Sequence, residues 1–237
     1  MAWTAEDIPS QEGRLALVTG ANSGLGLATI KALATRQATV ILACRSNRKA
    51  EAAQQQLHDQ GLSGLELLEL DLADLSSVQR AAESVRDRHG RLDLLINNAG
   101  VMAPPRRTTV QGHELQFGVN HLGHQALTQA LLPLMEHRPD ARVVTVTSGA
   151  QYFGQIQWND PNWEQRYERY GAYGQSKLAN VMFALELDAR LRQRKSTIRS
   201  LAAHPGLART QLQPTAIASG GNRVEALAYR LMDPLFQ

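Results

Sequence analysis

Cysteine is almost absent from this sequence, with one residue, Cys44, in 237. The chain can therefore form no internal disulfide, which fits a reducing compartment. No apolar run approaches the roughly 20 residues that a helix needs to span a bilayer. Segment 1–11 is polar and acidic, unlike a signal peptide. These absences predict a cytoplasmic protein with no membrane span.

An excess of charge of one sign is also missing. The chain has 25 basic and 22 acidic residues, for a formal net charge of +3. The most basic stretch, 190–195, is interrupted by Leu191 and Gln193, which is typical of a solvated helix face. No RNA- or DNA-binding motif is present. We therefore expect no nucleic-acid partner.

Two further kinds of site find no support in the sequence. A Ser-His-Asp hydrolase would need a Gly-x-Ser-x-Gly elbow, and none occurs. Among the seven histidines, His113, His121 and His124 lie nearest to one another, but they lack metal-ligand spacing and have no cysteine partners. We expect them to be surface or packing residues, and we expect no metal site.

Short apolar segments alternate with helical patterns along the chain. Strands are predicted at 15–18, 39–43, 65–70, 92–96, 142–147 and 198–203. Helices are predicted at 25–36, 47–60, 75–88, 172–194 and 224–232, with an interrupted helical stretch at 110–137. This alternation is typical of an α/β fold in which a doubly wound, Rossmann-like parallel sheet is covered on both faces. We expect a single domain over residues 1–237.

A polar, aromatic-rich insertion, 151–171, separates the fifth predicted strand from the long helix that follows it. Its rings are Tyr152, Phe153, Trp158, Trp163, Tyr167 and Tyr170. They could line a site for an apolar or aromatic substrate, or they could pack the insertion onto the rest of the protein. The sequence leaves both interpretations open.

A glycine-rich turn, Thr19-Gly20-Ala21-Asn22-Ser23-Gly24-Leu25-Gly26, joins the first predicted strand to the first helix. Gly20 permits a tight turn, Gly24 lets the backbone approach a pyrophosphate, and Gly26 allows close helix packing. The helix N-terminus adds free N–H groups and a positive dipole end. We therefore predict a dinucleotide site made by Gly20, Asn22, Ser23, Gly24, Leu25 and Gly26.

The end of the second predicted strand indicates which dinucleotide is bound. NAD enzymes usually carry an Asp or Glu there for the ribose 2′-hydroxyl, but this sequence reads Ala43-Cys44-Arg45-Ser46. Arg45 is a permanent cation whose donor fork suits a 2′-phosphate, and Ser46 adds a hydroxyl. We therefore predict NADP(H) as the cofactor.

Tyr173 and Lys177 are four residues apart on a predicted helix, so they share a face. A tyrosine with a pKa near 10 is a poor base, and a nearby ammonium is expected to lower that pKa. Tyr173 would then exchange a proton with a carbonyl or alcohol oxygen. Ser148, at the end of the fifth predicted strand, would hydrogen-bond that oxygen.

These motifs, taken in order, resemble those of the short-chain dehydrogenase/reductase family. The matching residues are the Gly-x-x-x-Gly-x-Gly turn, Asn97-Asn98-Ala99-Gly100, Asn120, Ser148, Tyr173 with Lys177, and Pro205-Gly206 with Thr210. The resemblance covers roughly residues 14–210. It implies an oxidoreductase that moves a hydride between NADP(H) and a small-molecule carbonyl or alcohol substrate.

The resemblance also implies roles for single residues. Asn120 would hold a water in a proton relay, and Lys177 would hold the nicotinamide ribose. Asp71 would lie beside the adenine, although a turn or helix-capping role is the alternative. Further cofactor contacts would come from Leu72, Asn98, Ala99, Gly100, Tyr173, Lys177, Pro205, Gly206 and Thr210.

Within the family, the long insertion, Ala43-Cys44-Arg45 and the segment 173–180 are similar to the retinol dehydrogenase and protochlorophyllide reductase-like branch, in its soluble bacterial form. Members usually add a seventh strand, but no strand is evident after 198–203, so we expect the sheet to lack it and the chain to be truncated. A homo-oligomer is a further expectation. The alternative function is a non-catalytic module that senses a dinucleotide.

Overall fold

Six parallel strands form one sheet in the computed structural model, which describes residues 4–206 and residue 218. The strand order is β3-β2-β1-β4-β5-β6. The strands are β1 (Leu15–Thr19), β2 (Thr39–Cys44), β3 (Leu65–Glu69), β4 (Leu94–Asn97), β5 (Arg142–Val146) and β6 (Arg199–Ala203). The predicted doubly wound parallel fold is confirmed.

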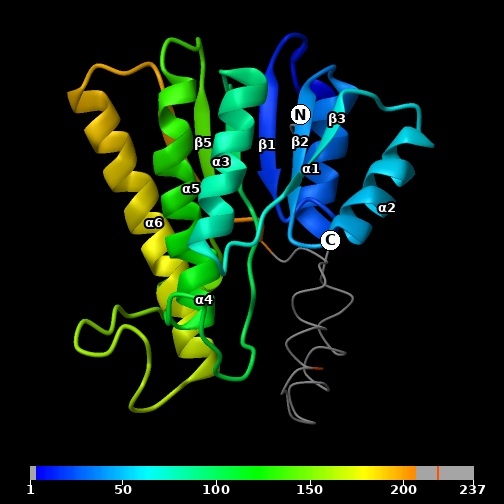
Figure 1. Ribbon diagram of the computed structural model, residues 1–237. Helices are drawn as coiled ribbons and strands as arrows, with labels where there is room; N and C mark the ends of the chain where they lie inside the picture. Colours follow the sequence, from blue (N-terminus) through cyan, green and yellow to red (C-terminus); the bar gives the residue numbers. More distant parts are fainter. Residues whose placement is uncertain (1–3, 207–217, 219–237) are drawn as a thin grey trace.

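Helices cover both faces of this sheet (Figure 1). The long helices are α1 (Gly24–Thr35), α2 (Asn47–His58), α3 (Leu75–His89), α5 (Gly123–Leu131) and α6 (Arg169–Gln193). Shorter turns are η1 (Ala5–Asp7), α4 (Leu115–Phe117), the π-helix η2 (Gly118–Leu122), η3 (Leu132–Met135) and η4 (Gly149–Tyr152).

The strands alternate between two apolar layers because successive side chains of a strand point to opposite faces. In β1, Leu15 and Leu17 pack with residues of α3, α5 and α6. Ala16 and Val18 pack with residues of α1 and α2 on the other face. Both faces of β1 and β2 are buried, so these inner strands are almost entirely apolar, as covered parallel strands usually are. The edge strands β3 and β6 are more exposed and carry Glu66, Glu69 and Arg199.

The structure corrects three of the predicted boundaries. The interrupted helical stretch predicted at 110–137 begins only at α4, because a bridge between Thr108 and Glu114 closes a turn before it. A π-helical turn then separates α4 from α5. The helix expected from Ala172 already begins at Arg169, and β4 begins at Leu94 rather than Leu92.

The edges of the sheet are β3 and β6 within the described residues, since each pairs there with one neighbour. The predicted helix 224–232 and Thr210 lie outside these residues. No helix in the described segments is long and apolar enough to cross a membrane. The single-domain extent, the cytoplasmic location and the C-terminal truncation stay predictions.

The strand order reverses between β1 and β4, because the chain crosses there from one half of the sheet to the other. Crossovers to either side leave a crevice outside the carboxyl ends of the strands at such a point. These ends point downward in Figure 1, and the segment between η4 and α6 extends from the same end of the molecule. The topology therefore places a binding site beside the ends of β1 and β4.

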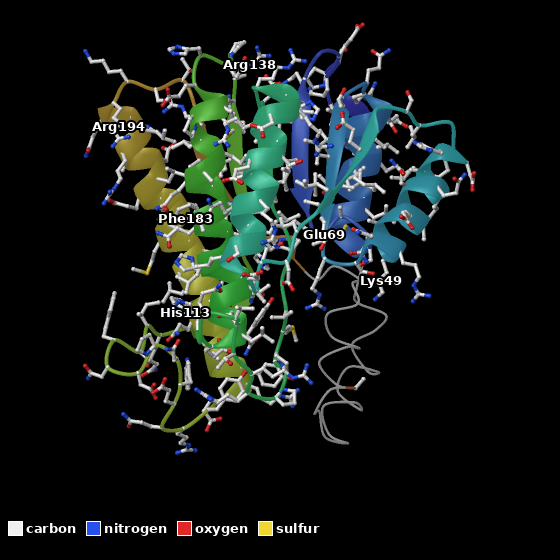
Figure 2. The ribbon with its side chains drawn as sticks, in the orientation of Figure 1. Lys49, Glu69, His113, Arg138, Phe183 and Arg194 are labelled. Carbon is white, nitrogen blue, oxygen red and sulfur yellow. The ribbon has the colours of Figure 1, made fainter. Side chains whose placement is uncertain are left out.

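The opposite end of the sheet is held by a buried carboxylate. Asp93 is 1% exposed, and its Oδ2 accepts a hydrogen bond of 2.9 Å from the Leu15 backbone N–H. Its Oδ1 accepts one of 2.8 Å from the Arg138 guanidinium, which Figure 2 shows at the end of the molecule away from Glu69. Asp93 thus joins the starts of β1 and β4 to the segment after η3.

We expect Asp93→Ala to lower the free energy of unfolding by about 2–4 kcal/mol, because it leaves a buried N–H and a half-buried guanidinium without their acceptor. Chemical denaturation measures this difference. The matched control is Glu186→Gln, which removes the acid of an exposed pair with Arg190 and should change the same quantity by less than about 0.5 kcal/mol. Equal effects of the two substitutions would contradict the role given to Asp93.

Candidate active site

A cavity of about 530 Å³ opens at the carboxyl ends of β1 and β4. Its walls come from the glycine-rich turn, the ends of β2 and β3, the segment after β4, the end of β5, and α6. The predicted site residues that line it are Gly20, Asn22, Ser23, Gly24, Leu25, Arg45, Asp71, Leu72, Asn98, Ala99, Gly100, Ser148, Tyr173, Lys177, Pro205 and Gly206. Residues far apart in the sequence are therefore gathered in one place.

The glycine-rich turn has the geometry that its sequence predicts. Gly20 has φ +66°, in the left-handed region that favours glycine. Gly26 does not line the cavity, but a Cβ there would collide with the Gly20 carbonyl and the Asn98 amide. Gly26 therefore lets α1 pack against the end of β1, and the helix N-terminus opens onto the cavity.

Thr19 was not among the predicted site residues, yet its hydroxyl joins two walls of the cavity. The Thr19 Oγ1 accepts hydrogen bonds of 2.9 Å from the backbone N–H groups of Asn98 and Ala99. The Asn98 amide donates in return to the Thr19 carbonyl at 2.8 Å. The position of Thr19, directly before Gly20, was the available signal.

The end of β2 presents a cation to the cavity. Arg45 is exposed and lines the cavity, and no carboxylate of the described residues pairs with it. Ser46 does not line the cavity and instead stands at the N-cap position of α2. Cys44 is buried beside the backbone N–H groups of Ala21 and Asn22, and burial raises the pKa of its thiol.

Asp71 makes the turn contact that the sequence left open as an alternative, and its place beside the adenine stays a prediction. It lines the cavity, while its Oδ1 accepts a hydrogen bond of 2.9 Å from the Ala73 backbone N–H in the turn before α3. This hydrogen bond therefore fixes the position of the Asp71 carboxylate in the cavity wall.

The predicted catalytic side chains meet at the other end of the cavity. Tyr173 and Lys177 are buried on α6, with the Lys177 Nζ 5.7 Å from the centre of the Tyr173 ring. Lys177 donates a hydrogen bond of 3.2 Å to the Val146 carbonyl at the end of β5. Ser148 follows β5 and lies within hydrogen-bonding reach of the Tyr173 hydroxyl.

The expectation that Lys177 lowers the pKa of Tyr173 does not hold in this structure. Burial raises the pKa of Tyr173, and the hydrogen bond with Ser148 opposes the rise. Burial also lowers the pKa of Lys177, to about 8. Desolvation penalises the charged form of both groups and outweighs their attraction. Tyr173 is therefore a protonated phenol at neutral pH, ready to donate.

Asn120 lies behind the cavity rather than on its wall. It is fully buried in the π-helical turn, and its Oδ1 accepts from the Val101 N–H at 2.8 Å. Its Nδ2 donates to the Val101 carbonyl and to the Ser176 hydroxyl, both at 2.9 Å. The side chain thus ties the segment after β4 to α6 one residue before Lys177, and the relay water expected at Asn120 stays a prediction.

None of the six aromatic residues of the insertion is among the described residues that line the cavity. Tyr152, Phe153 and Trp158 are exposed. Trp163 packs against Gly171 at the start of α6, where a Cβ would lie 2.7 Å from the indole. The apolar wall instead comes from Met102, Pro104, Leu115 and Val119, which the sequence analysis did not single out.

Glu114 holds the insertion in place through Tyr167. Its fully buried carboxylate accepts hydrogen bonds from the N–H groups of Gln116 and Phe117, at 2.9 and 2.7 Å. The Tyr167 hydroxyl lies 3.2 Å from Glu114 Oε1 and 3.1 Å from the Pro104 carbonyl, and it accepts a hydrogen bond of 2.9 Å from Gln116. Burial raises the pKa of Glu114.

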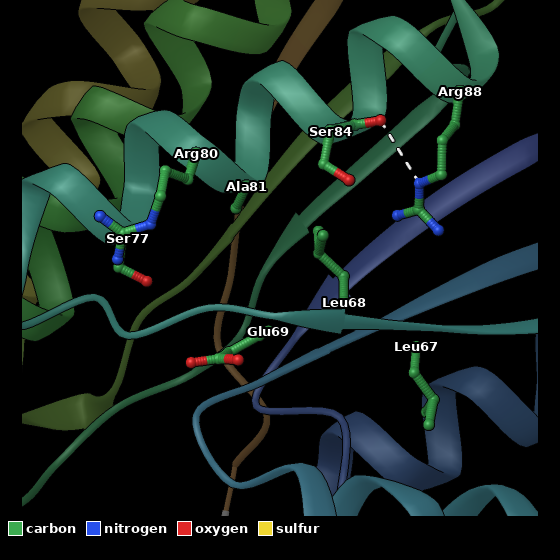
Figure 3. A pocket seen from close by; sticks show the side chains of 8 residues that line it. All are labelled: Leu67, Leu68, Glu69, Ser77, Arg80, Ala81, Ser84 and Arg88. Atoms are coloured by element: carbon green, nitrogen blue, oxygen red, sulfur yellow. Dashed lines mark hydrogen bonds between the residues drawn. The ribbon is translucent and has the colours of Figure 1, made fainter.

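A second hollow, of about 370 Å³, lies between β3 and α3 (Figure 3). Its charged groups are engaged within the protein, since Arg88 contacts Glu66 at 3.5 Å and Arg80 contacts Asp74 at 3.8 Å. The buried Ser77 hydroxyl accepts the Asp71 backbone N–H. We therefore assign no ligand to this hollow, and no metal-binding cluster occurs in the described segments.

Comparison with known proteins agrees with this arrangement. A family model for short chain dehydrogenases matches residues 14–219. The chain belongs to the short-chain dehydrogenase family. Human retinol dehydrogenases 13 and 14 are each 44% identical to it across 84% of the chain, which places it in the retinol dehydrogenase-like branch. The chain spans 60% and 63% of the lengths of these two relatives.

Solved structures show the same fold in relatives of this chain. A crystal structure of a protein from Mycobacterium paratuberculosis is 48% identical, with a TM-score of 0.80, over 96% of this chain and 81% of that one. A short-chain dehydrogenase from Shigella flexneri, complexed with NADP, is 26% identical with a TM-score of 0.69. The match covers 88% of this chain and 83% of the Shigella flexneri chain.

We expect Tyr167→Phe to lower the free energy of unfolding by about 1–2 kcal/mol, because it removes a hydroxyl that donates and accepts inside the Glu114 cluster. The matched control is Tyr152→Phe in the same insertion, at a side chain that is 84% exposed, which should cost less than about 0.5 kcal/mol. Chemical denaturation compares the two. A Tyr167→Phe protein as stable as the control would show that this cluster does not hold the insertion.

Proposed function

We propose that this dehydrogenase transfers a hydride between NADP(H) and the carbonyl or alcohol carbon of a small apolar substrate. The observation that carries the proposal is that Ser148, Tyr173 and Lys177 share one cavity with the glycine-rich turn and Arg45. A dinucleotide-sensing module would need the turn but not the acid/base group, so the complete set favours an enzyme.

The described residues fit a dinucleotide. The N-terminus of α1 offers backbone N–H groups to a pyrophosphate, with close approach allowed by Gly24. Arg45, at the end of β2, pairs with no carboxylate of residues 4–206 and stands where an NAD enzyme would have a carboxylate. The Shigella flexneri relative with bound NADP supports the same preference.

When bound, NADPH supplies the hydride and the protein supplies position and a proton. Tyr173 donates its phenol proton to the substrate oxygen, and the Ser148 hydroxyl orients that oxygen. Lys177, with a pKa of about 8, is mostly protonated at neutral pH and stabilises the phenolate that forms. Because burial raises the pKa of Tyr173, the phenol is protonated at neutral pH and holds the proton that carbonyl reduction requires.

The apolar part of the cavity supports an apolar substrate. Met102, Pro104, Leu115 and Val119 line the side nearest the insertion. Burying a carbonyl compound against them excludes water from the reacting atoms and strengthens the hydrogen bonds made there. The retinol dehydrogenase names of the curated relatives agree with a lipid-like substrate.

Arg45→Asp tests the proposed cofactor. The substitution replaces the cation with a carboxylate that repels a 2′-phosphate and can accept the 2′-hydroxyl of NADH. We expect NADPH affinity to fall at least tenfold and NADH affinity to change little, as measured by calorimetry with both dinucleotides. The control is Arg194→Asp at the end of α6 (Figure 2). Wild-type protein that binds NADH as tightly as NADPH would refute the preference.

Tyr173→Phe tests the proposed chemistry. The variant keeps the ring but has no proton to transfer, so we expect turnover of a panel of aldehydes and ketones to fall at least ~100-fold. NADPH binding should survive, which calorimetry checks. Tyr152→Phe serves as the control, since this tyrosine is exposed. Wild-type turnover by the Tyr173→Phe protein would exclude the assigned role.

A further inference from the structure

His124 is a fully buried imidazole whose two nitrogens are both engaged. It lies in α5, four residues after Asn120, and is 1% exposed. Its Nδ1 is 2.9 Å from the Asn120 backbone carbonyl oxygen. Its Nε2 is 2.8 Å from the Thr19 hydroxyl. The ring thus stands between the end of β1 and the π-helical turn that carries Asn120.

The partners fix the state of this ring. A carbonyl oxygen can only accept, so Nδ1 must carry the hydrogen. Thr19 Oγ1 already accepts from the N–H groups of Asn98 and Ala99, which leaves its own hydrogen to donate. Of the two acceptors within reach of that hydrogen, Nε2 at 2.8 Å is nearer than the Ile96 carbonyl at 3.4 Å. The ring is therefore neutral, with Nε2 accepting.

The π-helical turn makes the contact with Asn120 available. In such a turn the backbone N–H bonds five residues back rather than four, as the Gly123 N–H does to the Gly118 carbonyl. A carbonyl four residues back can then accept from a side chain. His124 supplies that donor, and so the position of its ring depends on the turn that also places the Asn120 side chain.

We propose that His124 is a positioning residue that couples the nucleotide-binding turn to the catalytic face of α6 through Thr19 on one side and Asn120 on the other. The chain of hydrogen bonds runs from the Asn98 and Ala99 N–H groups through Thr19 and His124 to Asn120, whose side chain binds Ser176 beside Lys177. The functional part of this inference rests on the proposed function. The hydrogen-bonded bridge itself does not.

Acid should break the bridge, because a protonated ring cannot accept from Thr19. Burial is the main cause that lowers the pKa of His124, to about 4, and the charges of Lys177 and His121 lower it further, while the bond to Asn120 opposes them. The folded pKa lies below the unfolded value of about 6.5. The stability gained from the neutral ring is therefore complete above pH 6.5 and is lost as the pH falls toward 4.

The first test needs neither cofactor nor substrate. The ¹⁵N and ¹H shifts of labelled histidine, assigned with His124→Phe, report the tautomer of each ring in the wild-type protein. We expect the His124 ring to carry its proton on Nδ1 at pH 7 and to remain neutral at pH 5.5, which lies below the usual pKa of an imidazole. A proton on Nε2, or a cation at pH 5.5, would overturn the proposal.

The second test measures coupling by calorimetry with NADPH. We expect His124→Phe to weaken binding about tenfold, the effect of one hydrogen bond, and Thr19→Val to weaken it at least as much. Adding His124→Phe to Thr19→Val should cost less than threefold more, because the bridge is already broken. Thr19→Ser keeps the hydroxyl and should recover most of the NADPH affinity that Thr19→Val loses, while His58→Phe is the control.

The outcomes separate the bridge from the function. Independent, multiplying effects of Thr19→Val and His124→Phe would overturn the coupling even if the tautomer is as expected. If wild-type protein bound no dinucleotide, the proposed function would fail, and the same cycle measured on the free energy of unfolding would then decide the bridge. If the His124→Phe protein does not fold, the His124 ring is assigned by through-bond correlation to its backbone in the wild-type protein, and the wild-type tautomer decides.

Discussion

The Thr19 hydroxyl is the contact on which the site depends. A parallel sheet leaves the backbone groups that follow β1 and β4 without strand partners at the point where a ligand must approach. The Thr19 hydroxyl oxygen accepts hydrogen bonds from two of these N–H groups, those of Asn98 and Ala99. The Asn98 side-chain amide donates to the Thr19 carbonyl. The glycine-rich turn and the segment after β4 are thereby held together as one wall of the cavity.

At the other end of the cavity, buried side chains also join segments that are far apart in the sequence. Asn120 ties the segment after β4 to α6, and Lys177 ties α6 to the end of β5. Both use buried side chains, so burial governs the charge of the site: it keeps the Tyr173 phenol protonated and makes Lys177 a weaker base. The insertion is attached through Glu114 and Tyr167. It is also attached through Gln175 on α6, whose side chain bonds the Gln157 N–H and the Pro161 carbonyl.

The sequence was sufficient to predict what local patterns encode. The alternation of strands and helices, the glycine-rich turn, and the Tyr173 and Lys177 spacing all follow from periodicity or short motifs. Contacts between distant segments could not be predicted from the sequence, because no local pattern around His124 or Glu114 indicates that they contact Thr19 and Tyr167. The role of the aromatic insertion stayed open for the same reason, since its composition could not show that its rings do not line the cavity. The pKa of Tyr173 was misjudged because burial, which depends on the whole fold, outweighs the neighbouring charge.

The proposed function requires that the hydride pass directly from NADPH to the carbonyl carbon of the substrate. The most direct measurement is isotopic: NADPH deuterated at nicotinamide C4, in each of its two stereochemical forms, is incubated with the protein and a mixture of apolar aldehydes and ketones, and the alcohols are analysed by mass spectrometry. The account predicts one deuterium on the former carbonyl carbon, delivered from one face of the nicotinamide only. Alcohol without label from either form, or no alcohol from any carbonyl compound, would contradict it.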